Sequence, residues 1–263
     1  MNPILIATLL VSLIGLLIGV VLVNVGRKFA VEVDEKEIAV RDCLPGNNCG
    51  GCGYAGCDAL AAAIVKGEAP VTGCPVGGAP VAEKIGHIMD IEAGEMVHTA
   101  AFVKCSGDSE KSIHLANYIG IPDCQAAADS GLGTKSCPYG CLGLGSCVKA
   151  CPYDAIHIVN GIAKVNRARC MSCSRCVSVC PRHLIEIIPD DAVYAVSCSN
   201  PERGPAVKKV CQAGCIGCKM CERQCEFDAI HVIDNVARID YSKCTRCGKC
   251  AEKCPTKVIT VRF

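Results

Sequence analysis

Cysteines in this chain recur at a spacing that constrains the fold more than any other feature. The spacing Cys-x2-Cys-x2-Cys-x3-Cys runs from Cys170 to Cys180, and it returns from Cys215 to Cys225 and from Cys244 to Cys254. A stretched fourth copy runs from Cys137 to Cys151. Such a run holds iron–sulfur clusters, and its fourth cysteine binds the neighbouring cluster. The pattern therefore predicts small cluster-binding domains in a chain that carries electrons.

Two other uses of cysteine fit the sequence less well. A disulfide framework is typical of short chains in an oxidising compartment, whereas this chain has 263 residues and an odd number of cysteines, 25. Structural zinc suits paired Cys-x2-Cys units, and a triple step followed by x3-Cys is not such a pair. We therefore expect iron–sulfur clusters rather than disulfides or zinc.

The composition agrees with small domains that metal holds together. Aromatic residues make up only 4% of the chain and tryptophan is absent, so large apolar cores are not expected to be the main source of stability. Bonds between metal and thiolate supply folding free energy directly. The formal net charge of +1 becomes more negative once the ligating thiols ionise and the clusters add their own charge.

Residues 3–25 contain no charged side chain and are mostly aliphatic. As a helix this stretch is long enough to cross a hydrocarbon core of about 30 Å, and Arg27 and Lys28 follow it directly. The positive-inside rule then places the rest of the chain in the cytoplasm, whereas a signal peptide would need a basic start and a small-residue cleavage site. We predict a transmembrane anchor at 1–28, and hence a single-pass protein of the cytoplasmic membrane that contacts the lipid bilayer through residues 3–25.

The first group of cysteines predicts a small helical 4Fe–4S domain at 29–100. Three cysteines lie close together, and a fourth follows a helix that we predict over 58–66 and that Gly67 and Pro70 end. Glycines between the first three cysteines let the backbone approach a cluster. The expected ligands are Cys49, Cys52, Cys57 and Cys74. Cys43, six residues earlier, is expected to be a free or packing thiol.

The rest of the chain is one sequence unit written twice. A shift of 74 residues places Cys124 on Cys198 and Cys170 on Cys244 without a gap. In each unit a turn dipeptide, at 160–161 and at 234–235, separates two short apolar segments and predicts a β-hairpin; short helical turns are expected to present the cysteines. The predicted fold is therefore α+β and multidomain, with two tandem bacterial-ferredoxin-like domains at 101–190 and 191–263, each holding two clusters.

Crossed ligation, as in two-cluster ferredoxins, assigns ligands to three of these four clusters. The expected sets are Cys170, Cys173 and Cys176 with Cys151; Cys244, Cys247 and Cys250 with Cys225; and Cys215, Cys218 and Cys221 with Cys254. The fourth site is irregular, because Leu144 stands where the repeat would place a cysteine. The nearest replacement gives the set Cys137, Cys141, Cys147 and Cys180, and a degraded or three-iron site is the alternative.

The expected cofactors are therefore five 4Fe–4S clusters, and a sixth is an open alternative. Besides Cys43, four cysteines are left over, which is the number that one more cluster needs. The competing interpretation is that they are buried or free thiols, as is common in reduced cytosol. The candidate ligands of a sixth cluster are Cys105, Cys124, Cys198 and Cys211.

Three further segments carry a family resemblance. They are LPGNNCGGCGYAGC at 44–57, GCPVGG at 73–78 and SCPYGCLGLGSCVKACPYDAI at 136–156. Together with the N-terminal apolar segment and the paired motifs, this layout resembles the B subunit of the Rnf complex over essentially the whole chain. The resemblance implies a translocase that passes electrons between reduced ferredoxin and NAD, coupled to sodium or proton movement. It also implies that this chain takes electrons from soluble ferredoxin and relays them to the membrane and flavin-bearing subunits.

The residues themselves are consistent with a relay that performs no bond chemistry. The sequence has no dinucleotide-binding glycine motif after a strand and no P-loop, so we expect no nucleotide site, no catalytic residue and no nucleic-acid partner. His157 and His231 occupy equivalent strand positions and are expected to be structural. Five basic residues are either ordinary surface charges or a docking site for an acidic ferredoxin: Arg167, Arg169, Arg203, Lys208 and Lys209. The alternative functions are the electron-transfer subunit of another anchored redox enzyme and a membrane-tethered redox sensor.

Overall fold

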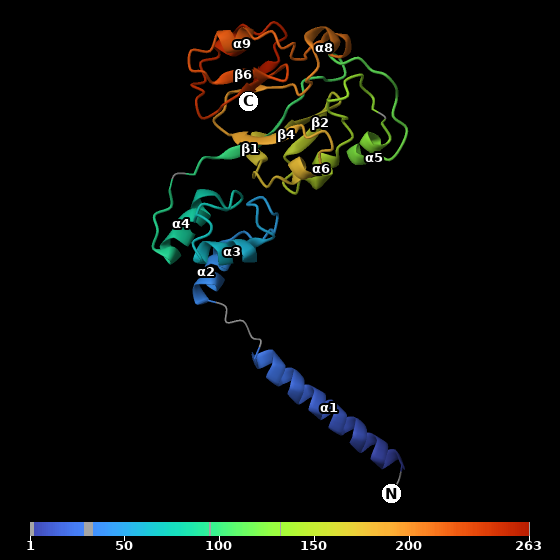
Figure 1. The fold of residues 1–263 in the computed structure, drawn as a ribbon, viewed down its shortest axis with the longest axis vertical. Helices are drawn as coiled ribbons and strands as arrows, with labels where there is room; N and C mark the ends of the chain where they lie inside the picture. Colours follow the sequence, from blue (N-terminus) through green and yellow to red (C-terminus); the bar gives the residue numbers. More distant parts are fainter. Residues whose placement is uncertain (1–2, 29–33, 95, 132, 263) are drawn as a thin grey trace.

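The computed structural model describes residues 3–28, 34–94, 96–131 and 133–262; within the first helix it describes the side chains of Ile4 and residues 9–25. Figure 1 shows three successive parts along the long axis of the molecule. They are the helix α1, a small helical domain, and a larger part that contains all the strands found in the described residues.

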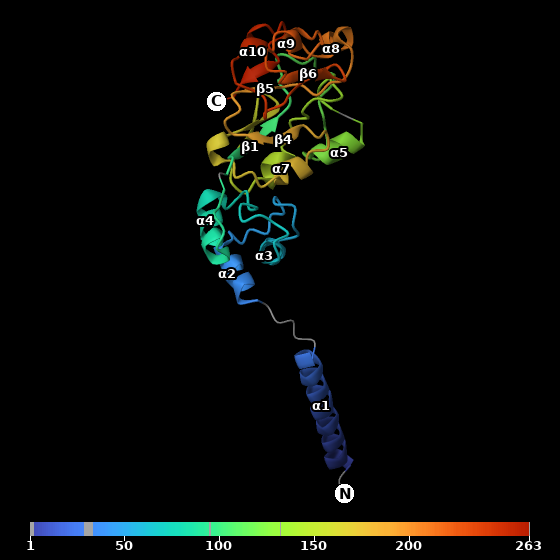
Figure 2. The same ribbon diagram turned by 60° about the vertical axis from the view of Figure 1, so that its left-hand side comes forward.

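The apolar N-terminal segment is helical, as predicted, but the membrane prediction is wrong. Helix α1 spans Pro3–Lys28 and extends away from the rest of the chain (Figure 2). In the part of the chain that is described, no helix is both long enough and apolar enough to cross a membrane. The predictions of a transmembrane anchor, of a single-pass protein and of lipid contact through 3–25 are therefore withdrawn.

The helical domain consists of three helices around one apolar core. They are α2 (Glu35–Cys43), α3 (Cys57–Val65) and α4 (Gly78–Met89). Helix α3 confirms the helix predicted over 58–66, and Gly67 follows it at a φ of +75°, where a glycine has no steric penalty. Leu60, Ile64 and Ile85 are fully buried between the helices.

Both predicted hairpins are present. In the first unit β2 (Ile156–Val159) pairs with β3 (Ile162–Val165), and in the second β6 (Ile230–Ile233) pairs with β7 (Val236–Ile239). The two turn residues of each hairpin have positive φ, 49° and 75° at Asn160 and Gly161. This geometry is that of a type I′ turn, which matches the twist of the strands it joins.

Two longer-range strand pairs close the units. Strand β1 (Thr99–Val103) pairs antiparallel with β4 (Ile185–Pro189), and β5 (Tyr194–Val196) pairs antiparallel with β8 (Ile259–Val261). Each pair therefore joins the first and last strands of one unit. The remaining helices are short: α5 (Cys124–Asp129), α6 (Ser146–Ala150), η1 (Arg167–Arg169), α7 (Arg175–Ser178), α8 (Gly204–Val210), α9 (Met220–Arg223) and α10 (Lys249–Glu252).

A segment that follows β1 joins the two units by hydrogen bonds, and the sequence repeat does not predict this contact. After β1 the chain crosses to the second unit, where Ser112 bridges Cys211. The Ile113 N–H donates to Val210 O at 3.0 Å, and the Gln212 N–H donates to Lys111 O at 2.8 Å. Residues that belong to the first unit by sequence thus pack against the end of α8 in the second.

Candidate metal centres

Twenty-four of the cysteines gather into six sets of four, which we number 1 to 6 along the molecule. Set 1 lies in the helical domain and consists of Cys49, Cys52, Cys57 and Cys74, which all pack in its apolar core. The loop before α3 is closed by the Cys57 N–H, which donates to Asn48 Oδ1 at 2.8 Å. The Gly77 N–H donates to Cys74 Sγ at 3.3 Å, and such bonds to sulfur tune a bound cluster.

Set 2 consists of Cys151, Cys170, Cys173 and Cys176. Burial, and then the charges of the other three thiols of the set, raise the pKa of Cys176 to about 12. The Ala155 N–H donates to Cys151 Sγ at 3.4 Å. The four cysteines are the ones that crossed ligation predicts.

Sets 5 and 6 form the second unit and also follow the crossed pattern. Set 5 is Cys215, Cys218, Cys221 and Cys254, and set 6 is Cys225, Cys244, Cys247 and Cys250; each set lines one pocket. Burial is the main cause that raises the pKa of Cys221 and of Cys250, each to about 11. The Ala229 N–H donates to Cys225 Sγ at 3.4 Å, which repeats the bond of Ala155 to Cys151 in the first unit.

Set 3 surrounds the irregular site and differs from the set expected there. The pocket contains Cys124, Cys141, Cys147 and Cys180. Burial, followed by the charges of Cys141, Cys124 and Cys180, raises the pKa of Cys147 to about 12. Cys137, which we expected as the fourth member, does not line this pocket. Cys124 comes instead from the start of α5, before the motif that contains Cys141 and Cys147.

Two hydrogen bonds hold Cys124 at this place. The Cys124 N–H donates to Ser146 Oγ at 2.7 Å, and the Ser146 hydroxyl donates to Asp123 Oδ2 at 2.7 Å. Ser146 is the first residue of α6, the helix that carries Cys147. The loop before α5 is therefore fastened to the helix that presents a second cysteine of the same set.

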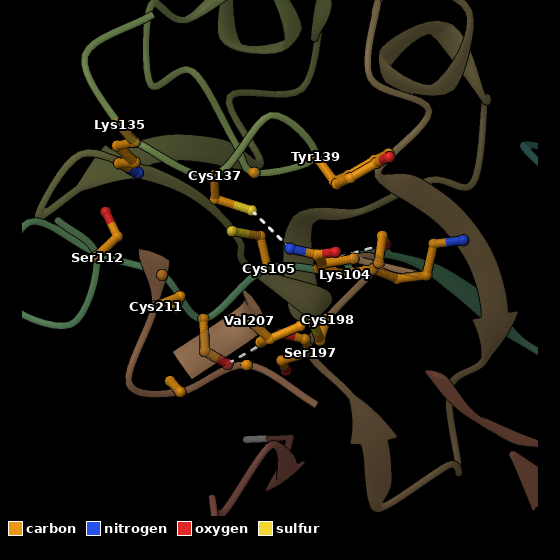
Figure 3. Close-up of a pocket in the computed structure, with 17 residues that line it drawn as sticks. Lys104, Cys105, Ser112, Lys135, Cys137, Tyr139, Ser197, Cys198, Val207 and Cys211 are labelled. Carbon is orange, nitrogen blue, oxygen red and sulfur yellow. Dashed lines mark hydrogen bonds between the residues drawn. The ribbon is translucent and has the colours of Figure 1, made fainter. Parts of the chain in front are cut away.

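Set 4 consists of cysteines that belong to none of the regular motifs. Cys105, Cys137, Cys198 and Cys211 line a single pocket between the two units, which Figure 3 shows in close-up. Burial raises the pKa of Cys211, and the charges of Cys105 and Cys137 raise it further. Asn200 Nδ2 donates to Cys137 Sγ at 3.7 Å. Three of the four predicted candidates for a sixth cluster are thus together, with Cys137 in the place of Cys124.

The geometry suits clusters better than single metal ions. Among the described residues, no three His, Cys, Asp or Glu side chains converge on one point as the ligands of a lone ion do. A 4Fe–4S cluster takes four cysteines, one for each iron, so its thiolates surround a volume. Buried thiols resist ionisation, and the charge of a bound metal reverses that preference. Four thiols that line one pocket, with backbone donors to sulfurs among them, therefore fit this cofactor.

Neighbouring sets touch one another from the helical domain into the first unit. The backbone of Gly51, in the loop of set 1, approaches set 2 so closely that a β-carbon there would lie 2.9 Å from Cys173 O. Burial raises the pKa of Cys173, and the charge of Cys49 raises it further. Cys176 of set 2 and Cys147 of set 3 are in turn buried in the same apolar core of the first unit.

The series continues from the first unit into the second through set 4. The Cys141 N–H of set 3 donates to Cys105 Sγ of set 4 at 3.4 Å. On its other side, set 4 contacts set 5. The backbone N–H of Cys215 forms a hydrogen bond with Cys198, and this bond opposes the rise in the pKa of Cys198 that burial causes. Sets 5 and 6 share the apolar core of the second unit. Each of the six sets therefore lies beside the next, through a backbone approach, a hydrogen bond or a shared apolar core.

Comparison with known proteins identifies the family. Four family models match this chain: "Putative Fe-S cluster" at 44–76, "4Fe-4S dicluster domain" at 134–181, and "4Fe-4S binding domain" at 212–228 and again at 237–260. The B subunit of the Na⁺-translocating ferredoxin:NAD⁺ oxidoreductase complex of Acetobacterium woodii is 42% identical over 99% of this chain and 78% of that protein. The B subunit of the ion-translocating oxidoreductase complex of Methanosarcina acetivorans is 43% identical over 95% of each chain. The chain belongs to the Rnf B-subunit family. A third member, from the proton-translocating ferredoxin:NAD⁺ oxidoreductase complex of Clostridium ljungdahlii, is 40% identical over 98% of this chain.

The chain therefore has 4Fe–4S domains and binds several iron–sulfur clusters, as its family does. The other residues that the sequence singled out in this Rnf family member have either structural contacts or positions on the surface. His157 and His231 lie on the hairpins and contact acidic residues of their own turns, at 154 and 228. Arg167 and Arg169 form ion pairs with Asp190 and Asp154. Cys43 packs against the core of the helical domain, which agrees with a packing thiol.

Proposed function

We propose that this member of the Rnf B-subunit family is the iron–sulfur electron-transfer subunit of an ion-translocating ferredoxin:NAD oxidoreductase. The observation that carries the proposal is the unbroken series of adjacent cysteine sets, which runs from the helical domain to the last unit. An iron–sulfur cluster supplies one-electron transfer at a potential that its protein surroundings tune. This chain contributes the order of the sets, their burial and the N–H groups that face the sulfurs.

The ligands that we propose for five clusters follow sets 1, 2, 3, 5 and 6. In sets 1, 2, 5 and 6 they are the cysteines that the spacing predicts, and in set 3 Cys124 takes the place that Leu144 leaves without a thiol. The domains that carry them are proposed to span 29–100, 101–190 and 191–263. The chemistry of four thiols around one pocket supports each assignment.

The second ferredoxin-like unit is proposed to receive electrons from a soluble ferredoxin. Cys218 and Cys247, which lie in this unit, are the two exposed cysteines of the chain, so a partner can approach sets 5 and 6 closely. Arg203, Lys208 and Lys209 are exposed at or beside α8 of the same unit. In the described part of the chain none of these three basic side chains is in an ion pair, in contrast to Arg167 and Arg169. Free positive charges of this kind attract an acidic partner and raise its association rate.

A charge reversal on α8 tests the docking surface. The double variant Lys208→Glu, Lys209→Glu is expected to slow reduction of the anaerobic protein by ferredoxin about tenfold at low salt and to weaken the dependence of that rate on salt. The matched control is Lys84→Glu, an exposed lysine on α4 of the helical domain. Stopped-flow absorbance measures both rates, and equal rates in the two variants would place ferredoxin elsewhere.

The relay itself is tested on protein purified anaerobically with its complex. Ferredoxin is expected to reduce this chain, and membrane and flavin-bearing subunits are expected to co-purify and to be reduced after it. A chain that isolates alone and stays oxidised when reduced ferredoxin is added would exclude the relay. Co-purification of a molybdenum or nickel–iron enzyme instead would indicate the electron-transfer subunit of a different redox enzyme.

A further inference from the structure

Gly51 lies where the helical domain meets the first ferredoxin-like unit. Figure 1 shows this domain between α1 and that unit. A β-carbon at Gly51 would lie 2.9 Å from Cys173 O and 3.1 Å from its carbonyl carbon and α-carbon. All three atoms belong to the main chain, so no side-chain rotation could make room. Gly51 lies between Cys49 and Cys52 of set 1, and Cys173 belongs to set 2. The main chains of two cysteine sets therefore touch at this glycine.

The backbone conformation of Gly51 does not itself require glycine. Its neighbours Gly50 and Gly53 have positive φ, 73° and 85°, which is a conformation that side chains disfavour. Gly51 has no positive φ, so its φ is open to any residue. The three atoms nearest to a β-carbon at Gly51 all belong to Cys173 of the neighbouring unit. What excludes a side chain at this position is therefore the contact between the two domains.

The two loops that meet here are each fastened within their own domain. On the side of Cys173, the Ser172 hydroxyl donates to Thr99 O, and the Thr99 hydroxyl donates to Ser172 Oγ at 2.9 Å. Ser172 is buried. On the other side, the Gly53 N–H donates to Gly50 O at 2.9 Å and closes a tight turn. A side chain at position 51 would therefore push the domains apart rather than bend either loop.

Polar and apolar contacts beside Gly51 keep the two loops facing each other. Asn47 Nδ2 donates to Tyr153 Oη at 2.7 Å, and Arg175 Nη2 donates to Asn47 O at 3.5 Å. Tyr153 also packs against the apolar core of the helical domain, and Cys173 is buried in that core. These side chains orient the domains, whereas the main-chain atoms at Gly51 limit how closely the domains approach.

We propose that Gly51 is a positioning residue that sets the gap between sets 1 and 2, and that any side chain here slows electron transfer between the helical domain and the first unit. Electron tunnelling between two centres slows steeply as the distance between them grows. Gly51 supplies no ligand; it acts by letting the loop of set 1 lie against the main chain of Cys173. The role in electron transfer rests on the proposed relay, whereas the contact itself does not.

Gly51→Ala tests the spacing, and Gly94→Ala is the matched control. A β-carbon at Gly94 would meet no atom within 4 Å, and Gly94 has no positive φ. Both variants are expected to keep the iron content of the wild type, because every cysteine ligand is unchanged. In Gly51→Ala, hydrogen exchange in the facing loops 47–53 and 171–175 is expected to be about tenfold faster, a factor that corresponds to about 1.4 kcal/mol and is typical of overpacking. Gly94→Ala is expected to exchange like the wild type.

EPR of the reduced protein measures the gap directly. The signal of set 1 is identified by its loss in Cys74→Ser. In Gly51→Ala the magnetic interaction between reduced sets 1 and 2 is expected to weaken, and in Gly51→Val to weaken further. Rapid-freeze EPR is expected to show slower reduction of set 1 by reduced ferredoxin in both variants, while sets 2, 3, 5 and 6 are reduced at the wild-type rate.

The outcomes separate the spacing from the relay. A wild-type chain that ferredoxin does not reduce would exclude the relay, and the magnetic interaction in protein reduced with dithionite would still decide the spacing. An unchanged interaction together with unchanged exchange in Gly51→Ala would overturn the proposal, as would equal changes in Gly94→Ala. Loss of the iron of set 1 in Gly51→Ala would assign the glycine to the folding of set 1 itself, and would also overturn it.

Discussion

The buried ammonium of Lys135 lies between two cysteine sets, and its removal is expected to lower two reduction potentials. Lys135 is only 8% exposed, and its Nζ donates to Cys141 O at 3.0 Å and to Gly161 O at 2.7 Å. Its positive charge opposes the rise in pKa that burial causes at Cys141 in set 3 and at Cys211 in set 4. The same charge favours the more negative, reduced form of a cluster at either place.

Coulomb's law gives the size of the effect. For charges about 7 Å apart in an effective dielectric constant of about 20, the interaction is about 2 kcal/mol. One electron moved through 100 mV corresponds to about 2.3 kcal/mol. Lys135→Met should therefore lower the potentials at sets 3 and 4 by about 100 mV each. The control Lys164→Met removes an exposed charge from β3, where water screens it, and should shift them by about 25 mV at most.

Redox titration followed by EPR measures these potentials in both variants. Sets 5 and 6, which do not contact Lys135, supply an internal reference. Lys135→Arg keeps the charge and is expected to restore most of the shift. Equal shifts in the Lys135→Met and Lys164→Met proteins, or no shift in a Lys135→Met protein that retains all its iron, would refute the electrostatic argument.

Two further substitutions test the assembly of the sites. Cys124→Ser is expected to remove about four irons and the EPR signal of set 3, whereas Cys137→Ser is expected to spare set 3 and remove set 4; the reverse result would restore the ligand set expected from sequence. Arg262→Met removes two hydrogen bonds to backbone carbonyls, at 3.0 Å to Pro189 O and 3.2 Å to Ala192 O. It also removes a guanidinium that lies 5.5 Å from an aromatic ring centre. The combined cost of about 3 kcal/mol should make the backbone amides of β5 and β8 exchange about a hundredfold faster. Hydrogen exchange followed by mass spectrometry measures this rate. Strands that stayed as protected as in the wild type would contradict the prediction.

Much of the local structure could be predicted because its causes are local. The turn dipeptide at 160–161 adopts the positive φ values of a type I′ turn, and the hairpin follows from it. The alanine-rich segment before Gly67 forms the predicted helix α3. Sets 2, 5 and 6 follow the motif because short helical turns present three cysteines from one run and the hairpin returns the fourth. A helix over the apolar segment 3–25 was also predicted and lies within α1, but its assignment to a membrane was wrong.

The choice between Cys124 and Cys137 could not be made from spacing. The repeat makes Cys124 equivalent to Cys198, and Cys137 equivalent to Cys211, yet the equivalents do not all serve the same set. In the second unit Cys218 completes set 5, so Cys198 is free for set 4. In the first unit Leu144 stands at that position, and Cys124 is needed in set 3. Two copies of one unit have thus used the same cysteine position differently.

The sequence by itself determined the chemistry, the duplication and the cysteine sets whose members lie in one or two neighbouring motifs, because the short path between them leaves the chain few ways to arrange them. Only the tertiary structure decided sets 3 and 4. Their cysteines are brought together by the segment that crosses from β1 to α8 and by the bond that fastens Cys124 to Ser146. The physical reason is that these contacts depend on how the two units pack against each other, and the spacing of residues in the sequence does not specify that interface.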